Sequence, residues 1–300
     1  MSCSPLYNTK KNTCYSLQDL KNIVKNYNKE LDNDNKINLN QNKKNLYESL
    51  VKANYDECGN NEYCWLKQNY MEINEDIGKF LKKFRPEQPN SWKSNPNQWL
   101  NTYNLLNVMN QYEEKYKNFK FLGVHPIDFA LKINNSSCIS QNMCDLNISN
   151  LIKNKIYKIG TIFNLDKHYQ SGSHWVSLFI NLNQTSKNYG IYYYDSVSMP
   201  APLEIKNFVS KIISDNDKLN NKLNNKLNNK LNNKLNNKLK FYENNIKHQF
   251  ENSECGMFSL YFIDQCLKNV SFSNFINKKN LNDDAVFKLR NKYFNKKNSF

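Results

Sequence analysis

The sequence predicts an α+β fold, in which a small mixed β-sheet packs against an apolar helix, preceded by a mainly helical N-terminal region. Two segments rich in aromatic and β-branched residues, 173–181 and 188–196, flank a short polar connector, as the strands of a hairpin do. A polar run then leads into an apolar segment that begins at Cys255, and this segment has the character of a buried helix. The residues before 86 have helical periodicity, starting with a capping-box pattern at 16–19.

The other elements follow from the same periodicities. We expect further helices at 45–54, 65–84, 99–117 and 202–214, and further strands at 119–124, 157–165 and 239–242. Prolines at 86 and 89 interrupt the pattern, so we place a domain boundary there, between a helical region at 1–85 and a second domain at 86–300.

A low-complexity insertion at 218–240 interrupts the second domain. A Lys-Leu-Asn-Asn unit occurs five times between Lys218 and Asn237. A helical turn holds 3.6 residues, so a leucine at every fourth position drifts by about 40° per repeat and forms no stable apolar face. We therefore expect an extended or weakly helical projection without a function of its own.

Cys255 is a candidate nucleophile because it stands at the predicted start of a helix. Helix N-termini carry unpaired N–H groups and a partial positive charge, and both favour the thiolate. The alternative is a small buried residue of an apolar helix, which is the commoner role of a free cysteine. Cys266 lies about three helical turns further on and is too distant to join the same site.

His174 is the favoured general base among the four histidines. If the hairpin is symmetric about its connector, a pairing of Ile180 with Tyr189 also pairs His174 with Asp195, at a Cβ separation of about 4.5–5.5 Å. A base and its orienting carboxylate would then meet, although a slip of one residue would separate them. The alternative is an ordinary core or surface histidine. The other three histidines are weaker candidates, and His125 and His168 have no evident acid partner.

These residues resemble the superfamily of SUMO proteases and the adenovirus protease. The likeness spans about residues 86–275 and is closest to virion maturation proteases of large cytoplasmic DNA viruses. It rests on His174-Trp175, Asp195-Ser196, Gln249 followed six residues later by Cys255-Gly256, and Trp99-Leu100-Asn101, which resembles the opening of the family's catalytic domain.

The resemblance implies a papain-like cysteine protease core with Cys255 as nucleophile, His174 as general base and Asp195 as the residue that orients the imidazole. Gln249 would donate its side-chain amide to the oxyanion, beside the backbone N–H of Cys255. Trp99 and Trp175 would flank a narrow diglycine segment of the substrate. On the residues alone, a glutamine such as Gln249 is usually a solvated side chain, and each tryptophan suits core packing as well as a substrate slot.

Three positions deserve comparison with the family pattern. Glu254 stands where the SUMO proteases usually have Asp, and Thr102 stands where they tend to have an acidic residue. We expect both differences to affect contacts with a ubiquitin-like substrate more than the chemistry. Gly256 costs a helix about 1 kcal/mol relative to Ala. Close approach of substrate or of a facing strand would explain its presence.

Eight cysteines need an assignment. Cys58 and Cys64 have the same spacing as Cys138 and Cys144, which is too wide for a typical zinc knuckle. We therefore predict no metal and no cofactor. Because the N-terminus lacks the features of a secretion signal, disulfides are disfavoured. We expect free thiols, with disulfides only after a virion meets an oxidant.

The net charge of +15 comes from 42 basic and 27 acidic residues, and only Arg85 and Arg290 are arginines. Lysine-rich proteins bind DNA nonspecifically, whereas base reading relies mostly on arginine. Nonspecific DNA binding through lysines therefore stays open, and so does a charge without any such function. No apolar run approaches the roughly 20 residues of a membrane helix, so we expect no membrane partner. The resemblance to virion maturation proteases implies a location in the virion and host cytoplasm.

The predicted function is a cysteine endopeptidase that cuts after Gly-Gly in viral precursor proteins of the capsid or core during virion maturation. One alternative is a deconjugase that removes a SUMO- or ubiquitin-like modifier with the same C-terminal diglycine. A second is a non-catalytic basic scaffold associated with the virion or with nucleic acid. The complete Cys, His, Asp and Gln set favours an enzyme, and the helical N-terminal region and Thr102 favour precursor cleavage.

Overall fold

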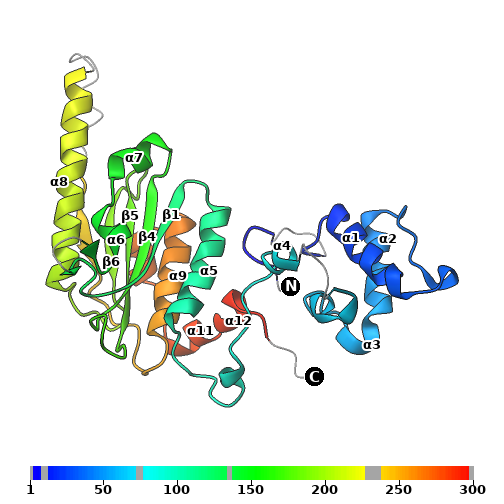
Figure 1. Ribbon diagram of the computed structural model, residues 1–300. Coiled ribbons are helices and arrows are strands. Elements are labelled where there is room, and N and C mark those ends of the chain that lie inside the picture. The colour runs from blue at the N-terminus through cyan, green and yellow to red at the C-terminus, as the bar shows by residue number, and fades with distance from the viewer. Residues whose placement is uncertain (1–2, 8–12, 72–76, 134–136, 227–237, 297–300) are drawn as a thin grey trace. The chain divides into compact units, whose positions relative to one another are not determined.

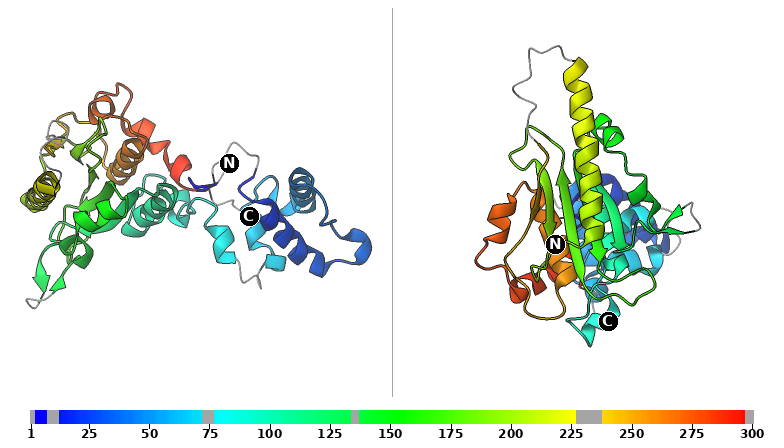
Figure 2. Two further views of the ribbon diagram at one scale, coloured as in Figure 1. Left: turned by 90° about the horizontal axis from the view of Figure 1, so that it is seen from above. Right: turned by 90° about the vertical axis from the view of Figure 1, so that its left-hand side faces the viewer.

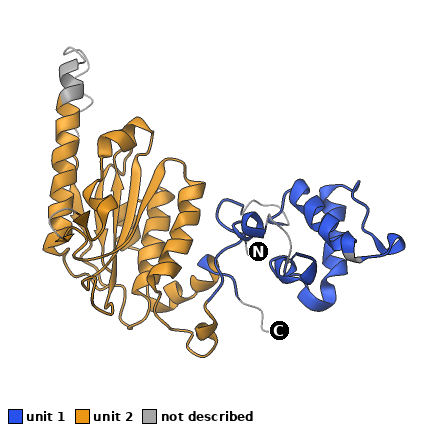
Figure 3. Ribbon diagram, viewed as in Figure 1, with its two compact units in different colours: residues 1–88, 293–300 blue, residues 89–292 orange. Residues whose placement is uncertain are grey.

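The fold is that of a computed structural model, which describes residues 3–7, 13–71, 77–133, 137–226 and 238–296 (Figure 1). The chain divides into two units (Figure 3). Unit 1 consists of residues 1–88 and 293–300, and unit 2 of residues 89–292. Each unit is described by itself.

Unit 1 is helical, as expected. Its helices are α1 (Leu17–Tyr27), α2 (Lys43–Ala53), α3 (Tyr55–Cys58) and α4 (Ile77–Leu81), with 3-10 turns at Asn28–Glu30, Asn33–Asn35, Cys64–Lys67 and Asn69–Met71. The predicted capping box opens α1, because Ser16 and Asp19 bond to each other's backbone N–H. The single helix predicted at 65–84 is wrong. Two 3-10 turns and α4 occupy its described part, and residues 72–76 lie outside the description.

Unit 2 holds a five-stranded mixed sheet in the order β1-β4-β5-β6-β7. The strands are β1 (Phe119–Pro126), β4 (Lys158–Asn164), β5 (Trp175–Asn181), β6 (Gly190–Tyr194) and β7 (Phe241–Glu243). The two outer pairings, β1 with β4 and β6 with β7, are parallel, and the inner ones are antiparallel. All five strands coincide with predicted segments to within two residues.

The rest of unit 2 surrounds this sheet. Its helices are α5 (Thr102–Lys115), α6 (Gln141–Cys144), α7 (Ile148–Lys153), α8 (Leu203–Lys226), α9 (Cys255–Leu267), α10 (Phe272–Ile276), α11 (Asp283–Phe287) and α12 (Arg290–Tyr293), with a 3-10 turn at Asn90–Lys93 and a small hairpin of β2 (Lys132–Ile133) and β3 (Ser137–Cys138). Helix α8 covers one face of the sheet, and α9 and α5 cover the other (Figures 1 and 2).

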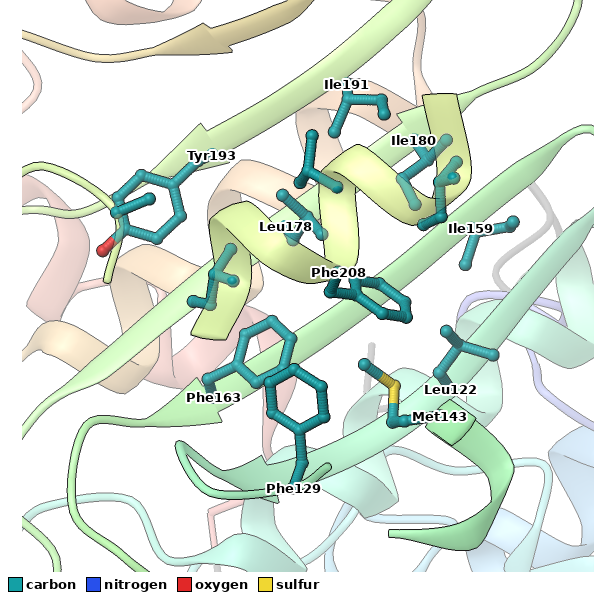
Figure 4. Close-up of a cluster of buried hydrophobic side chains, with 14 of the residues drawn as sticks. Leu122, Phe129, Met143, Ile159, Phe163, Leu178, Ile180, Ile191, Tyr193 and Phe208 are labelled. Atoms are coloured by element: carbon teal, nitrogen blue, oxygen red, sulfur yellow. The ribbon is translucent and has the colours of Figure 1, made fainter. Parts of the chain in front are cut away.

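The α8 face is an apolar cluster. Leu178 and Tyr193 of the sheet pack with Phe208 of α8, Met143 of α6 and Phe129 (Figure 4). On the opposite face, α9 is buried at every position except Gln265, so it is a central helix rather than an amphipathic surface one. The sheet and α9 thus form a rigid support for the residues at their ends.

The register of the β5–β6 hairpin differs from the predicted one by two residues. Ile180 pairs with Ile191 instead of Tyr189, because the connector folds into turns at 183–186 and 186–189 and holds more residues on the β6 side. A shift of two residues keeps every side chain on its predicted face. His174 precedes β5 and Asp195 follows β6, so neither belongs to the paired strands.

Helix α8 is longer than predicted. It continues past residue 214 to Lys226 and so includes the first two copies of the repeat. We expected the repeat to be extended or weakly helical, but its described first part, residues 218–226, continues α8. Residues 227–237 lie outside the description.

Six of the eight cysteines form disulfides, which corrects the expectation of free thiols. The pairs are Cys3–Cys14, Cys58–Cys64 and Cys138–Cys144, and Cys255 and Cys266 stay free. The expectation gave the cellular compartment more weight than the spacing of the cysteines. Five intervening residues are enough for the chain to reverse direction and bring two cysteines within bonding distance. Within the described ranges, we find no helix long and apolar enough to cross a membrane.

Candidate active site

Cys255 is the first residue of α9 and is only 2% exposed. Glu254, at the N-cap position, makes no side-chain cap, because its carboxylate binds Arg290 instead. No side chain of the N-cap therefore competes for the N–H groups at the start of α9. Such groups, together with the helix dipole, favour negative charge at this point.

His174 and Asp195 form a close pair at the open end of the β5–β6 hairpin. The Nε2 atom of His174 lies 2.7 Å from Oδ1 of Asp195. The Cys255 side chain is near enough to His174 to contribute to the pKa of its imidazole. Because Nε2 faces the carboxylate, Nδ1 is the ring nitrogen left for the thiol. The structure thus brings together Cys255, His174 and Asp195 as the sequence predicted.

The electrostatics of this group favour a protonated imidazole. Burial lowers the pKa of His174, but the hydrogen bonds to Asp195 and Cys255 and the negative charge of both partners outweigh burial and raise the pKa to about 9. His174 is therefore an imidazolium at neutral pH. An imidazolium beside a cysteine favours the thiolate, which is the attacking form.

Asp195 is held by its backbone as well as by its carboxylate. It is fully buried, and Oδ1 accepts a second hydrogen bond from the N–H of Val197, at 2.9 Å. Asn244 bonds both to the N–H and to the carbonyl of Asp195. Within the described residues, Oδ2 has no hydrogen-bond partner. The sequence reasoning missed Asn244, and no local pattern distinguishes it from the many other asparagines.

Gln249 is buried and its amide orientation is fixed. Its Oε1 atom accepts a hydrogen bond of 2.6 Å from the Ser196 hydroxyl, so Nε2 is the donor end. Nε2 donates to the carbonyl of Glu251 at 2.7 Å. The backbone N–H of Gln249 bonds to the carbonyl of Ser196, which joins this segment to the end of β6. Gln249 is therefore not the solvated residue of the alternative reading.

The two tryptophans lie on one cleft of about 840 Å³. Trp175 is buried, and its Nε1 donates to the carbonyl of Leu100 at 2.8 Å. Trp99 is 44% exposed and precedes α5, because the helix predicted at 99–117 begins only at Thr102. A Cβ on Gly256 would lie 3.0 Å from Leu100 and 3.2 Å from Trp175, so the expected close approach at this glycine comes from the protein itself.

The cleft is also lined by two connecting segments, within residues 139–142 and 164–172. The first of these is closed by the Cys138–Cys144 disulfide. His168 in the second segment does have an acid partner, since its Nδ1 lies 2.7 Å from Asp128, contrary to the sequence analysis. This pair is partly exposed. Neither of the two free cysteines, Cys255 and Cys266, belongs to these segments, so the segments supply no thiol for His168 to activate.

The remaining histidines have structural partners. His125 lies 2.9 Å from the Ser140 hydroxyl and 3.0 Å from the carbonyl of Leu122. His248 lies 3.0 Å from the hydroxyl of Tyr194 and 2.9 Å from the carbonyl of Ile276. Burial lowers the pKa of both histidines, which keeps them neutral.

A metal site is not formed by the described residues in this state. One group, Cys3, Cys14 and Glu62, places potential ligand atoms within 4.8 Å of one another. Cys3 and Cys14 are joined in a disulfide, however, so their thiolates are not available to an ion.

A thiol at a helix start, a paired imidazole and a buried carboxylate on an α+β sheet define a cysteine protease. Residues 72–299 match the model of the Ulp1 protease family, C-terminal catalytic domain. The chain belongs to this Ulp1 protease family.

Viral proteins are among its relatives. A protein of Acanthamoeba polyphaga mimivirus that is named as a thiol protease is 29% identical over 314 residues, covering 97% of this chain and 92% of its own length. The SUMO-1 cysteine protease of African swine fever virus is 24% identical over 144 residues, covering 48% of this chain and 46% of its own length.

A crystal structure of the African swine fever virus protease has the same fold. The TM-score is 0.64 at 19% identity, and the match covers 99% of this chain and 96% of that chain. The shared fold therefore extends over both units rather than the catalytic unit alone.

Proposed function

We propose that this cysteine protease is an endopeptidase that cleaves after Gly-Gly in viral precursor proteins of the capsid or core, during virion maturation, in the virion and host cytoplasm. The observation that carries the proposal is the cleft of Trp99 and Trp175, because Trp175 directly follows His174 in the chain. A substrate segment that passes between two indole rings next to the nucleophile is restricted to residues with little or no side chain.

The chemistry follows from the site. The Cys255 thiolate attacks the carbonyl carbon of the second glycine, and the carbonyl oxygen becomes an oxyanion. The backbone N–H of Cys255 and the Nε2 of Gln249 are the donors for that oxyanion, after Nε2 releases the carbonyl of Glu251. His174 gives its proton to the leaving amine as the C–N bond breaks, which leaves a thioester.

Hydrolysis of the thioester restores the enzyme. The neutral His174 takes a proton from a water molecule, and the resulting hydroxide attacks the thioester carbonyl. The C–S bond then breaks, releasing the carboxylate product and the Cys255 thiolate. Asp195 keeps Nε2 of His174 in place through both steps and stabilises the imidazolium whenever it forms.

Removal of a ubiquitin-like modifier is the second candidate function. The African swine fever virus relative is named a SUMO-1 cysteine protease, and this name favours the same substrate class here. Both functions use a diglycine before the cut, so the site chemistry is common to them. They differ in the leaving amine, which is a backbone α-amine in a precursor and a lysine ε-amine in a conjugate.

Two defined substrates distinguish the candidates. One is an unstructured peptide with an internal Gly-Gly followed by several residues, and the other is SUMO-1 joined to a peptide lysine. The proposal expects cleavage of the linear peptide by the wild type and none by Cys255→Ser. Cleavage of the conjugate alone would instead assign the deconjugase function.

Nonspecific DNA binding through the lysines is a further part of the proposal. The net charge of +15 supports electrostatic attraction to any duplex, with an affinity that falls steeply as salt is added. Fluorescence anisotropy with two unrelated duplexes, at about 50 and 200 mM salt, tests it. Equal affinity for both duplexes and a steep loss with salt are expected.

A further inference from the structure

Arg290 and Glu254 form a buried ion pair directly next to the nucleophile. Nη2 of Arg290 donates to Oε1 of Glu254 at 2.7 Å, and Nε donates to Oε2 at 3.1 Å. Arg290 is 3% exposed and Glu254 is 2% exposed. This is a two-point contact between the planar guanidinium and the carboxylate, and it fixes both the distance and the relative orientation of the groups.

The same guanidinium also binds the segment that leads to the cleft. Nη2 donates to the carbonyl of Gln98 at 2.9 Å, and the guanidinium carbon lies 4.4 Å from the ring centre of Trp92. Three parts of unit 2 that are distant in the sequence therefore meet at one side chain. We call Arg290, Glu254, Gln98 and Trp92 the arginine clamp.

The position of the clamp suggests what it does. Glu254 directly precedes Cys255, and Gln98 directly precedes Trp99. We propose that Arg290 is a positioning residue, which sets the start of α9 and the Trp99 edge of the cleft at a fixed distance from each other. Through Glu254 it places the thiol and the backbone N–H of Cys255, and through Gln98 it places one wall of the diglycine slot.

The residue types fit this role. Arginine presents several N–H donors in one rigid plane, so it can bind a carboxylate and a carbonyl at once, whereas lysine has a single compact charge. Glu254 is one methylene longer than Asp, the residue expected here from the family pattern. With this length Glu254 contacts Arg290 at two points, so the departure at 254 is accompanied by an arginine 36 positions away.

A matched control lies on the same two helices. Lys292 of α12 pairs with the buried Asp264 of α9, as does Lys268. Asp264 is nine residues beyond Cys255, or roughly 13 Å along the helix. Lys292→Gln therefore removes an ion pair between α12 and α9 without touching the start of α9.

The test compares Arg290→Lys, Glu254→Asp and Lys292→Gln in the full-length protein. Two quantities are measured at a temperature where circular dichroism shows all variants folded. One is kcat and KM on the Gly-Gly peptide, and the other is the rate at which iodoacetamide alkylates Cys255, followed by mass spectrometry. Iodoacetamide is small and needs no contact with Trp99, so it reports on the thiol alone.

We expect Arg290→Lys to lower kcat/KM about 10- to 100-fold, as for a reacting group displaced by about 1 Å, with a lower kcat, a higher KM and slower alkylation. Glu254→Asp keeps both charges but shortens the side chain that contacts Arg290, so it should lower kcat and the alkylation rate several-fold. Lys292→Gln should stay within about twofold of the wild type in both quantities even if its melting temperature falls.

Wild-type kcat, KM and alkylation rates in both Arg290→Lys and Glu254→Asp would overturn the proposal. So would equal losses in Lys292→Gln, because the effect would then be one of general stability. The test of the clamp rests on the proposed function only in the peptide assay, because alkylation needs no substrate. If the wild type cleaves no peptide, the proposed function fails, while the alkylation rates still decide the clamp.

Discussion

Asn244 holds the backbone of Asp195 through a reciprocal pair of hydrogen bonds. The N–H of Asp195 donates to Oδ1 of Asn244 at 2.8 Å, and Nδ2 of Asn244 donates to the carbonyl of Asp195 at 2.7 Å. A side-chain amide thus replaces the strand partner that Asp195 lacks, since β6 ends at Tyr194. The carboxylate that faces His174 is consequently supported from both sides.

Asn244→Ala should reduce both activity and stability. The substitution removes the partner of the buried N–H of Asp195, and an unpaired group of this kind costs about 1–3 kcal/mol. The Asp195 carbonyl loses one hydrogen bond but keeps the one from the N–H of Ser198. We expect a loss of at least 10-fold in kcat/KM, measured with the Gly-Gly peptide. Asn216→Ala is the control, because Asn216 is a similarly buried asparagine of α8 that donates to the hydroxyl of Tyr189, away from the triad. An equal loss of activity in both variants would contradict the positioning role of Asn244.

Asp195→Asn should lower kcat/KM by about 10²- to 10⁴-fold with the fold intact. The amide has nearly the shape of the carboxylate, but it lacks the charge that stabilises the His174 imidazolium. Steady-state kinetics measure the loss, and circular dichroism checks the fold. Activity within a few-fold of the wild type would show that Asp195 is not the orienting acid.

The stability contributed by His174 should depend on pH. The pKa of His174 is raised to about 9 in the folded protein, from 6.5 in the unfolded chain. Protonation therefore favours the folded state. Its contribution is fully present below pH 6.5 and is lost as the pH rises to 9. The linkage relation puts it on the order of 3 kcal/mol.

Urea unfolding of the wild type and of His174→Gln checks this expectation. The difference in unfolding free energy between the two proteins should be largest near pH 6 and should narrow by pH 9.5. A difference that does not change over this range would mean that Asp195 and Cys255 do not raise the pKa.

Gly256→Ala should damage the site although alanine is the better helix former. Its Cβ would lie 3.0 Å from Leu100 and 3.2 Å from Trp175, and overpacking of this kind costs about 1–3 kcal/mol. Moving Trp175 should also raise KM for the Gly-Gly peptide. In contrast, Gly78→Ala in α4 meets no atom within 4 Å and should stabilise the protein by up to about 1 kcal/mol. Similar melting temperatures for the two variants would refute the close approach.

Much of unit 2 could be predicted because its strands and helices have strong local patterns. The hairpin register could not, because it depends on turns at 183–186 and 186–189 that strand periodicity does not reveal. His174 and Asp195 nevertheless meet, since both side chains lie past the paired strands and the error was an even number of residues. The parallel pairings of β1 with β4 and of β6 with β7 join segments that no turn connects, so only the folded sheet defines them.

The supporting residues of the site were beyond local reasoning. Asn244 lies 49 positions from Asp195, and Arg290 lies 36 positions from Glu254. Neither residue belongs to a motif, and both act through geometry that forms only on folding. The disulfides were missed for a different reason, because an expectation about the cellular compartment was given more weight than the spacing of Cys58 and Cys64 and of Cys138 and Cys144.

The most direct test of the central claim is cleavage mapping of a mixed peptide library by mass spectrometry, with the wild type and Cys255→Ala compared under reducing conditions. The proposed function, with a triad of Cys255, His174 and Asp195 and a substrate slot between Trp99 and Trp175, predicts cuts after Gly-Gly that are absent in the variant. Cuts that persist in Cys255→Ala would contradict the nucleophile. Wild-type cuts at sites without Gly-Gly would contradict the slot.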